Sequence, residues 1–205
     1  MLAPLSRLYR RMRYGEPVVV VSGLPRSGTS MLMKMLEAGG LALVTDGIRT
    51  ADEDNPKGYY EVERVKDLAN EQDKSYLRGA RGKGIKVISY LLRSLPDDLN
   101  YRVVFVRRDL EEILASQRKM LERRGESHEI ESKQMRELFQ DDLWRSSWLL
   151  KNGAQFESIE VHYREVLAQP LDQARRVSAF LGGGLDAEAM AAAVDPTLYR
   201  NRAQK

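Results

Sequence analysis

The run Glu16-Pro-Val-Val-Val-Val-Ser22, which is followed by Gly23, constrains the fold of this chain more than any other segment. Four consecutive valines without a polar break are typical of a strand that is buried on both faces. From Thr29 to Ala38 the apolar side chains change to helical spacing, and Gly39 ends the pattern. Strand, glycine-containing loop and helix together predict the first βα unit of a parallel α/β sheet.

Later segments continue this alternation of strands and helices. Further short strands are predicted at 41–44, 84–88, 101–106 and 156–162. Helices are predicted at 62–74, 109–125, 131–151 and 171–181. We therefore predict an α/β fold of the P-loop nucleotide-binding type, with a central parallel β-sheet of about five strands and helices on both faces.

Length and composition limit the other possibilities. The 205 residues fit one domain, so we expect residues 1–205 to form a single unit, with a basic helix at 1–15 and a basic tail at 195–205. The absence of cysteine excludes disulfides and fits a reducing compartment, which predicts a cytoplasmic protein. The formal net charge is only +3, so electrostatics do not require a nucleic-acid partner, and we expect none.

The first thirteen residues carry four arginines and no acidic residue. Leu8 and Met12 are among the apolar residues that recur there at helical spacing, which predicts a short basic amphipathic helix. Contact with a membrane surface or an acidic partner is one interpretation. The favoured one is a helix that packs on its own domain and leaves its arginines in solvent.

The loop Gly23-Leu-Pro-Arg-Ser-Gly28-Thr-Ser30 separates the first strand from the first helix. Its Gly-x4-Gly spacing matches a P-loop, in which backbone N–H groups and a helix N-terminus hold an anion. Thr29 stands where the lysine of a nucleoside-triphosphate loop is expected, which argues against a triphosphate ligand. A cation stands inside the loop instead, at Arg26.

The core Pro25-Arg-Ser-Gly-Thr29 resembles the 5′-phosphosulfate loop of sulfotransferases that use 3′-phosphoadenosine 5′-phosphosulfate (PAPS). The resemblance implies transfer of a sulfuryl group to a hydroxyl or amine acceptor of unidentified type, with release of 3′,5′-phosphoadenosine and no requirement for a metal. It also implies that the 5′-phosphosulfate is held by Pro25, Arg26, Ser27, Gly28, Thr29 and Ser30.

A second motif is expected for the separate 3′ phosphate of PAPS. Sulfotransferases carry an Arg-x7-Ser pair on a strand–helix unit, and Arg108 with Ser116 has that spacing. The resemblance therefore implies that these two side chains bind the 3′ phosphate. Arginine suits this task because its guanidinium can donate two hydrogen bonds to one phosphate. The neighbouring Arg107 is expected to face solvent or to pair with Asp109.

The resemblance covers most of the chain, from about Val18 to Gly182, but departs from the family in two places. The segment from Val161 to Pro170 is similar to the closing segment of bacterial sulfotransferases, and its Tyr163 is expected to pack in the core. Lys86 matches a family lysine beside the leaving group, whereas the histidine base that follows it in cytosolic relatives is missing. A C-terminal Gly-x-x-Gly-x-x-Lys stretch is also missing; the arginines after residue 198 either replace it or form a solvated tail.

The general base is therefore predicted from another motif. Asn55-Pro-Lys-Gly-Tyr-Tyr-Glu61 resembles a stretch at the acceptor side of bacterial relatives, which implies Glu61 as the base, with Lys86 and Arg26 as the other catalytic residues. Glu61 as a simple cap of a helix beginning at Val62 is the alternative. His128 and His162 are weaker candidates, because neither stands where the family has its histidine.

Two other functions stay open at this point. A P-loop kinase or NTPase would turn over ATP with magnesium, but it would have to act without the usual lysine. A non-catalytic module would bind an anionic nucleotide and transfer nothing.

Overall fold

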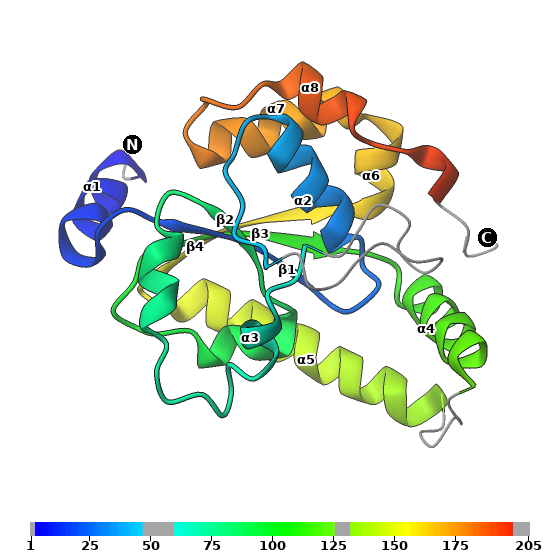
Figure 1. Ribbon diagram of the computed structural model, residues 1–205. Helices are drawn as coiled ribbons and strands as arrows, with labels where there is room; N and C mark the ends of the chain where they lie inside the picture. The colour runs from blue at the N-terminus through cyan, green and yellow to red at the C-terminus, as the bar shows by residue number, and fades with distance from the viewer. Residues whose placement is uncertain (1–2, 47–59, 126–131, 199–205) are drawn as a thin grey trace.

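The structure, a computed structural model, describes residues 3–46, 60–125 and 132–198. Its centre is a parallel sheet in the order β2-β1-β3-β4 (Figure 1). The strands are β1 (Val18–Gly23), β2 (Gly84–Lys86), β3 (Tyr101–Arg107) and β4 (Phe156–His162). The predicted α/β class and parallel sheet are confirmed, and the continuous apolar strand β1 has an interior position, as its sequence indicates.

The predicted count of about five strands is wrong, since the described residues contain four. The segment 41–44 forms only a single parallel bridge, between Leu43 and Gly84. The Gly84 N–H donates to Ala42 O and the Val44 N–H donates to Gly84 O, both at 2.8 Å. The pairing stops there because β2 is itself only three residues long and offers a short edge.

Both faces of the sheet are buried, and alternate residues of β1 belong to different cores. Val18 and Val20 pack in one core, and Val19 and Val21 pack in the other. This two-sided burial explains why the strand has no alternation of polar and apolar residues.

Helices cover the two faces, as Figure 1 shows. The first face is covered by α3 (Glu63–Lys66), α5 (Ser132–Asn152) and the 3₁₀ helices η1 (Ser75–Ala80) and η2 (Ser89–Ser94). The second is covered by α2 (Thr29–Ala38), α6 (Tyr163–Ala168), α7 (Pro170–Leu181) and α8 (Ala187–Ala192). The remaining elements are α1 (Ala3–Tyr14), α4 (Leu110–Arg124) and η3 (Pro196–Leu198).

Two predictions about helices had opposite outcomes. The one over 109–125 is confirmed: the Asp109 side chain accepts hydrogen bonds from the N–H groups of Glu111 and Glu112, and Gly125 ends α4 in the left-handed conformation. The one over 62–74 is wrong beyond its first turn, because α3 ends at Lys66. The Arg64 side chain folds back there to Glu71 and to the backbone oxygen of Asp73, which favours a turn over a continued helix.

Among the described helices, none combines the length and the apolar character that crossing a membrane requires.

A buried polar contact joins α5 to η2, just after β2 ends. The Ser89 hydroxyl donates to a carboxylate oxygen of Asp142, and the Ser146 hydroxyl lies 3.3 Å from the Ser89 carbonyl oxygen. Both serines are buried. Burial raises the pKa of Asp142, and the hydrogen bonds from Ser89 and Ser146 oppose this rise only in part.

The raised pKa predicts how stability depends on pH. Because the folded state favours protonated Asp142, this residue stabilises the fold at low pH and loses that contribution as pH rises through its folded pKa. Asp142→Asn keeps an oxygen acceptor for Ser89 and has no charge, so its stability relative to the parent should increase from acid to neutral pH. Urea unfolding at several pH values measures this. The control is Asp141→Asn, because Asp141 is exposed and pairs with Arg145. The prediction would be contradicted if the parent and Asp142→Asn showed the same pH dependence of stability.

Candidate functional site

The phosphate-binding loop predicted from the sequence lies between the carboxyl end of β1 and the start of α2. Two glycines let the backbone pass through a crowded space. A Cβ atom on Gly23 would lie 2.7 Å from the carbonyl oxygen of Val106, and one on Gly28 would lie 2.5 Å from the ring of Tyr163. Gly28 also has a φ of +106°, which favours glycine. Larger residues at either position would displace the loop.

The loop ends at the N-terminus of α2. The N-cap residue is Gly28, which has no side chain to cap the helix. The first N–H groups of a helix have no partner within it, and together with the helix dipole they favour an anion. Thr29 is buried in the first turn, and the next residue is Ser30.

Arg26 has a backbone conformation that is uncommon for a residue with a side chain. Its φ is +68°, in the left-handed region, where a Cβ atom is unfavourable. This conformation accompanies two contacts with the strand–helix unit of β3 and α4. The Arg26 Nε donates to Ser116 Oγ at 3.1 Å, and Arg108 Nη1 donates to the Arg26 carbonyl oxygen at 3.0 Å. The structure thus brings the loop together with both residues of the second motif.

Arg108 is held in place by two further contacts. Its Nε lies 3.0 Å from Glu112 Oε2, and its guanidinium lies over the ring of Tyr163, 4.5 Å from the centroid. The Glu112 carboxylate is fully buried and also accepts hydrogen bonds from Arg164, with Nη2 at 2.5 Å and Nε at 3.1 Å from Oε1. A buried carboxylate needs such partners, because removal from water is costly. Two guanidinium groups therefore share one carboxylate beside the loop.

Sequence analysis did not predict these roles of Glu112 and Arg164. The spacing of Arg108 and Glu112 was a usable signal, since the two residues stand four apart across the start of a predicted helix, where their side chains can meet. Arg164 gave none, because it comes from α6 and approaches Glu112 only in the folded chain.

Ser27 is turned inward beneath the loop. Its Oγ is fully buried without a hydrogen-bond partner, next to Gly23, and its N–H donates to the Leu24 carbonyl oxygen at 3.1 Å. Pro25 precedes Arg26 in the same turn. The cofactor-binding roles of Pro25 and Ser27 stay predictions.

The other two predicted catalytic residues contact each other. Lys86, the last residue of β2, is buried, and its Nζ lies 3.1 Å from Glu61 Oε1 and 3.3 Å from Ser30 Oγ. Glu61 is not the cap of the next helix, because Val62 is the N-cap of α3. Lys86 therefore joins Glu61 to the phosphate-binding loop.

Tyr60, next to Glu61, points elsewhere. Its hydroxyl donates to Glu37 on α2 at 2.7 Å. Burial and the Glu37 carboxylate raise the pKa of Tyr60 well above its usual range, so the hydroxyl stays protonated and acts as a donor.

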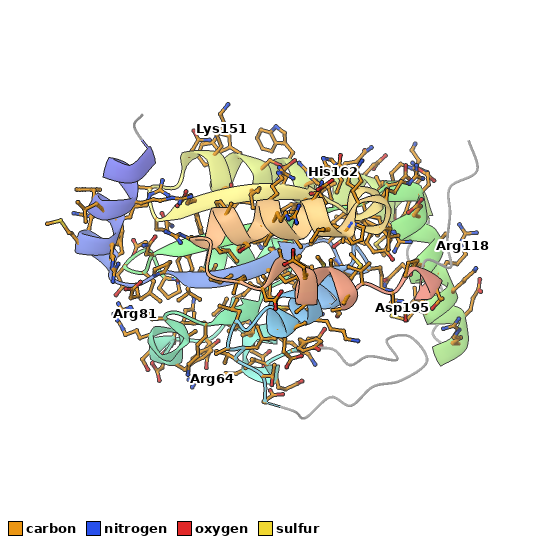
Figure 2. The ribbon with its side chains drawn as sticks, turned by 90° about the horizontal axis from the view of Figure 1, so that it is seen from above. Arg64, Arg81, Arg118, Lys151, His162 and Asp195 are labelled. Carbon is orange, nitrogen blue, oxygen red and sulfur yellow. The ribbon has the colours of Figure 1, made fainter. Side chains whose placement is uncertain are left out.

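The remaining candidates lie elsewhere. Arg107 faces α5, with its Nη2 2.8 Å from Ser147 Oγ and 2.9 Å from a carboxylate oxygen of Glu160 on β4. Its side chain is one-quarter exposed, and the carboxylate it pairs with is that of Glu160, whereas Asp109 was expected. His162 is exposed at the end of β4 (Figure 2). Positions 55–59, His128 and the tail beyond residue 198 lie outside the described residues.

Taken together, the site suits an anionic ligand. Among the contacts of the described residues, four cationic side chains meet there with two carboxylates, which gives this group an excess of positive charge beside a helix N-terminus. The cations are Arg26, Lys86, Arg108 and Arg164, and the carboxylates are Glu61 and Glu112.

Comparison with solved structures supports the fold. The structure is similar to a sulfotransferase from Alicyclobacillus acidocaldarius, with a TM-score of 0.50, 15% identity and coverage of 89% of this chain and 88% of that one. It is also similar to the sulfotransferase domain from the curacin biosynthetic pathway, with a TM-score of 0.51, 13% identity and coverage of 89% of both chains. No protein-family model and no curated protein matches the sequence. The chain therefore shares the α/β fold of these two sulfotransferases.

The left-handed backbone of Arg26 allows the effect of this residue on stability to be measured separately from its effect on ligand binding. Arg26→Gly and Arg26→Ala both remove the guanidinium, but only glycine suits a φ of +68°. We expect the glycine variant to be more stable than the alanine variant by about 1 kcal/mol in chemical unfolding. Both should bind 3′,5′-phosphoadenosine much more weakly than the parent in calorimetry. Equal stability of the two variants would show that the backbone of Arg26 is not strained. Parent-like affinity of both variants would show that the Arg26 side chain does not contribute to binding.

Proposed function

We propose that this protein is a sulfotransferase that transfers a sulfuryl group from PAPS to a hydroxyl or amine acceptor and releases 3′,5′-phosphoadenosine. One observation carries the proposal: the phosphate-binding loop and the second motif contact each other directly, through Arg26 with Ser116 and through Arg108 with the Arg26 carbonyl oxygen. PAPS has two separate anionic ends. Two neighbouring anion sites on one sheet edge are what such a ligand requires.

The residues present fit this co-substrate. The glycines at positions 23 and 28 let the loop backbone pass close to Val106 and Tyr163, where a Cβ atom would collide, and the N-terminus of α2, whose N-cap residue is a glycine, favours an anion. We assign the 5′ end to the loop with Arg26, Thr29 and Ser30, and the 3′ phosphate to Arg108 and Ser116. Bound PAPS would supply the sulfuryl group together with a phosphate as the leaving group.

Lys86 and Arg26 would stabilise the charge that develops on the leaving phosphate. Sulfuryl transfer resembles phosphoryl transfer, in which positioning and electrostatic stabilisation supply most of the catalysis. Lys86 Nζ lies beside the loop, within 3.3 Å of Ser30 Oγ, and its side chain is almost fully buried. A cation held in such surroundings interacts more strongly with a developing negative charge than one in water does.

Glu61 would remove the proton from the acceptor. Its carboxylate is held 3.1 Å from Lys86, which fixes its position relative to the loop, and its side chain remains one-fifth exposed. A carboxylate oxygen of Glu61 could therefore take a proton from an acceptor hydroxyl that enters from the solvent side.

The nucleotide preference tests the proposal. The parent should bind 3′,5′-phosphoadenosine without magnesium, and much more tightly than adenosine 5′-phosphate, in calorimetry. Arg108→Ala should remove most of this preference, on the order of 2–4 kcal/mol, because it leaves the 3′ phosphate without its main donor. The neighbour Arg107, which faces α5, gives the matched control Arg107→Ala, and this variant should retain the preference.

Three results would contradict this assignment. Equal affinity of the parent for both nucleotides would refute the second motif as a 3′-phosphate site. Tight binding of ATP that requires magnesium would favour a kinase or NTPase. Binding of 3′,5′-phosphoadenosine without transfer to a panel of phenols, alcohols and amines would favour a non-catalytic module.

Turnover tests the contact between Glu61 and Lys86. Glu61→Gln removes the proton acceptor and should lower kcat by on the order of 10²–10⁴. Lys86→Met should also lower kcat, and both variants should keep affinity for 3′,5′-phosphoadenosine within a few-fold. Lys66→Met is the control, since the Lys66 Nζ lies 4.0 Å from Glu61 at the surface. Full activity of Glu61→Gln would exclude Glu61 as the base, and loss of affinity with kcat intact would make Lys86 a binding residue.

A further inference from the structure

Helix α1 turns its apolar side toward solvent. Leu8, Tyr9 and Met12 are exposed to 56%, 60% and 80%. The opposite side of the helix contacts the rest of the protein through Arg7, whose Nε donates to Glu157 Oε1 at 2.8 Å and whose Nη2 donates to the Phe180 carbonyl oxygen at 3.2 Å. The predicted basic helix is present and contacts its own domain, as expected, but it does so through Arg7, an arginine that was expected in solvent.

The exposed apolar side is bordered by positive charge. Arg11 and Arg13 are exposed, and helical geometry puts them at the two edges of this apolar side, while α1 contains no acidic residue. Arg11 pairs with Glu16, which follows the helix. The basic surface continues beyond the helix at Arg81, whose Nη2 lies 3.3 Å from the Tyr14 carbonyl oxygen. Figure 2 shows Arg81 at the same end of the molecule as α1.

This surface lies away from the candidate functional site. α1 precedes β1 and stands near the amino ends of the strands, whereas the phosphate-binding loop follows the carboxyl end of β1 (Figure 1). A partner on the outer side of α1 would leave the loop accessible.

We propose that the outer side of α1, formed by Leu8, Tyr9, Met12, Arg11 and Arg13, binds an anionic lipid surface. A bilayer supplies both things that this side lacks: an apolar layer for the three exposed apolar side chains and phosphate groups for the arginines at their edges. The helix stands at the edge of the molecule, so a flat surface can reach it without a matching groove.

A second copy of the chain fits less well. Contact between two α1 helices through this side would bring Arg11 and Arg13 of both copies together, and the pairing of Arg11 with Glu16 offsets this repulsion only in part, because the helix itself has no acidic residue. An acidic protein would need an apolar strip bordered by carboxylates, whereas any anionic bilayer has the required layers.

Vesicle sedimentation tests this binding with the full chain. Vesicles of phosphatidylcholine alone are compared with vesicles that also contain phosphatidylglycerol, at low and high salt. We expect binding to the anionic vesicles only, and weaker binding at high salt, because the arginine contribution is screened.

Two double variants separate the apolar and the charged contributions. Leu8→Ser with Met12→Ser, and Arg11→Gln with Arg13→Gln, should each lower the partition constant for anionic vesicles by at least about tenfold. Leu138→Ser on α5 is the matched control, because Leu138 is exposed to the same 56% as Leu8, and it should bind like the parent. Thermal unfolding and affinity for 3′,5′-phosphoadenosine should be unchanged in all variants, so this test is independent of the proposed function.

The proposal would be overturned if the protein did not bind anionic vesicles or bound both kinds of vesicle equally. Parent-like vesicle binding by either double variant would also overturn it. A dimer in light scattering that the Leu8 and Met12 changes dissolve, without vesicle binding, would assign the surface to a second copy. Binding to polyglutamate but not to vesicles would assign it to an acidic protein.

Discussion

The candidate site depends on the parallel pairing of β1 with β3. The two strands run in register from Val18 opposite Tyr101 to Gly23 opposite Val106, so both end at the same level of the sheet. The loop that follows β1 and Arg108, which follows β3, are therefore neighbours, although about eighty residues separate them in the chain. Ligand sites of open parallel sheets form at such carboxyl ends, because the connections there diverge to opposite faces. A shift of this register would separate Arg26 from Ser116.

The buried Glu112 then determines how the arginines are presented. A carboxylate without solvent is stable only when it is paired and hydrogen-bonded, so Glu112 keeps Arg108 and Arg164 close to it. The Tyr163 ring restrains the Arg108 guanidinium from one side and fills the space next to Gly28. Preorganisation of this kind reduces the entropy that side chains lose when a ligand binds. It also has a cost, because the phosphate that we propose for this site would have to compete with Glu112 for the Arg108 donors.

The sequence predicted those parts of the structure that local chemistry determines. The valine run of β1 and the helix at 109–125 were identified correctly, since strand burial and the helix-end residues Asp109 and Gly125 leave direct signatures. The helix expected at 62–74 was wrong because its apolar spacing is also satisfied by one turn followed by the return of Arg64 to Glu71. Arg164 was missed for a related reason. Its partner is 52 residues away, and no local pattern marks a contact that only the fold creates.

The adjacent Arg107 and Arg108 show how the sheet separates two similar residues. Successive side chains at the end of a strand point to opposite faces. Arg107 follows Phe105 toward α5 and pairs with Glu160 and Ser147, whereas Arg108 follows Val106 toward the loop and Tyr163. Each arginine is satisfied on its own face, so neither can replace the other after a substitution. The Arg-x7-Ser spacing selects Arg108, because Ala115 stands eight residues after Arg107. The alternation of β3, counted from the buried Val104 and Val106, selects Arg108 independently.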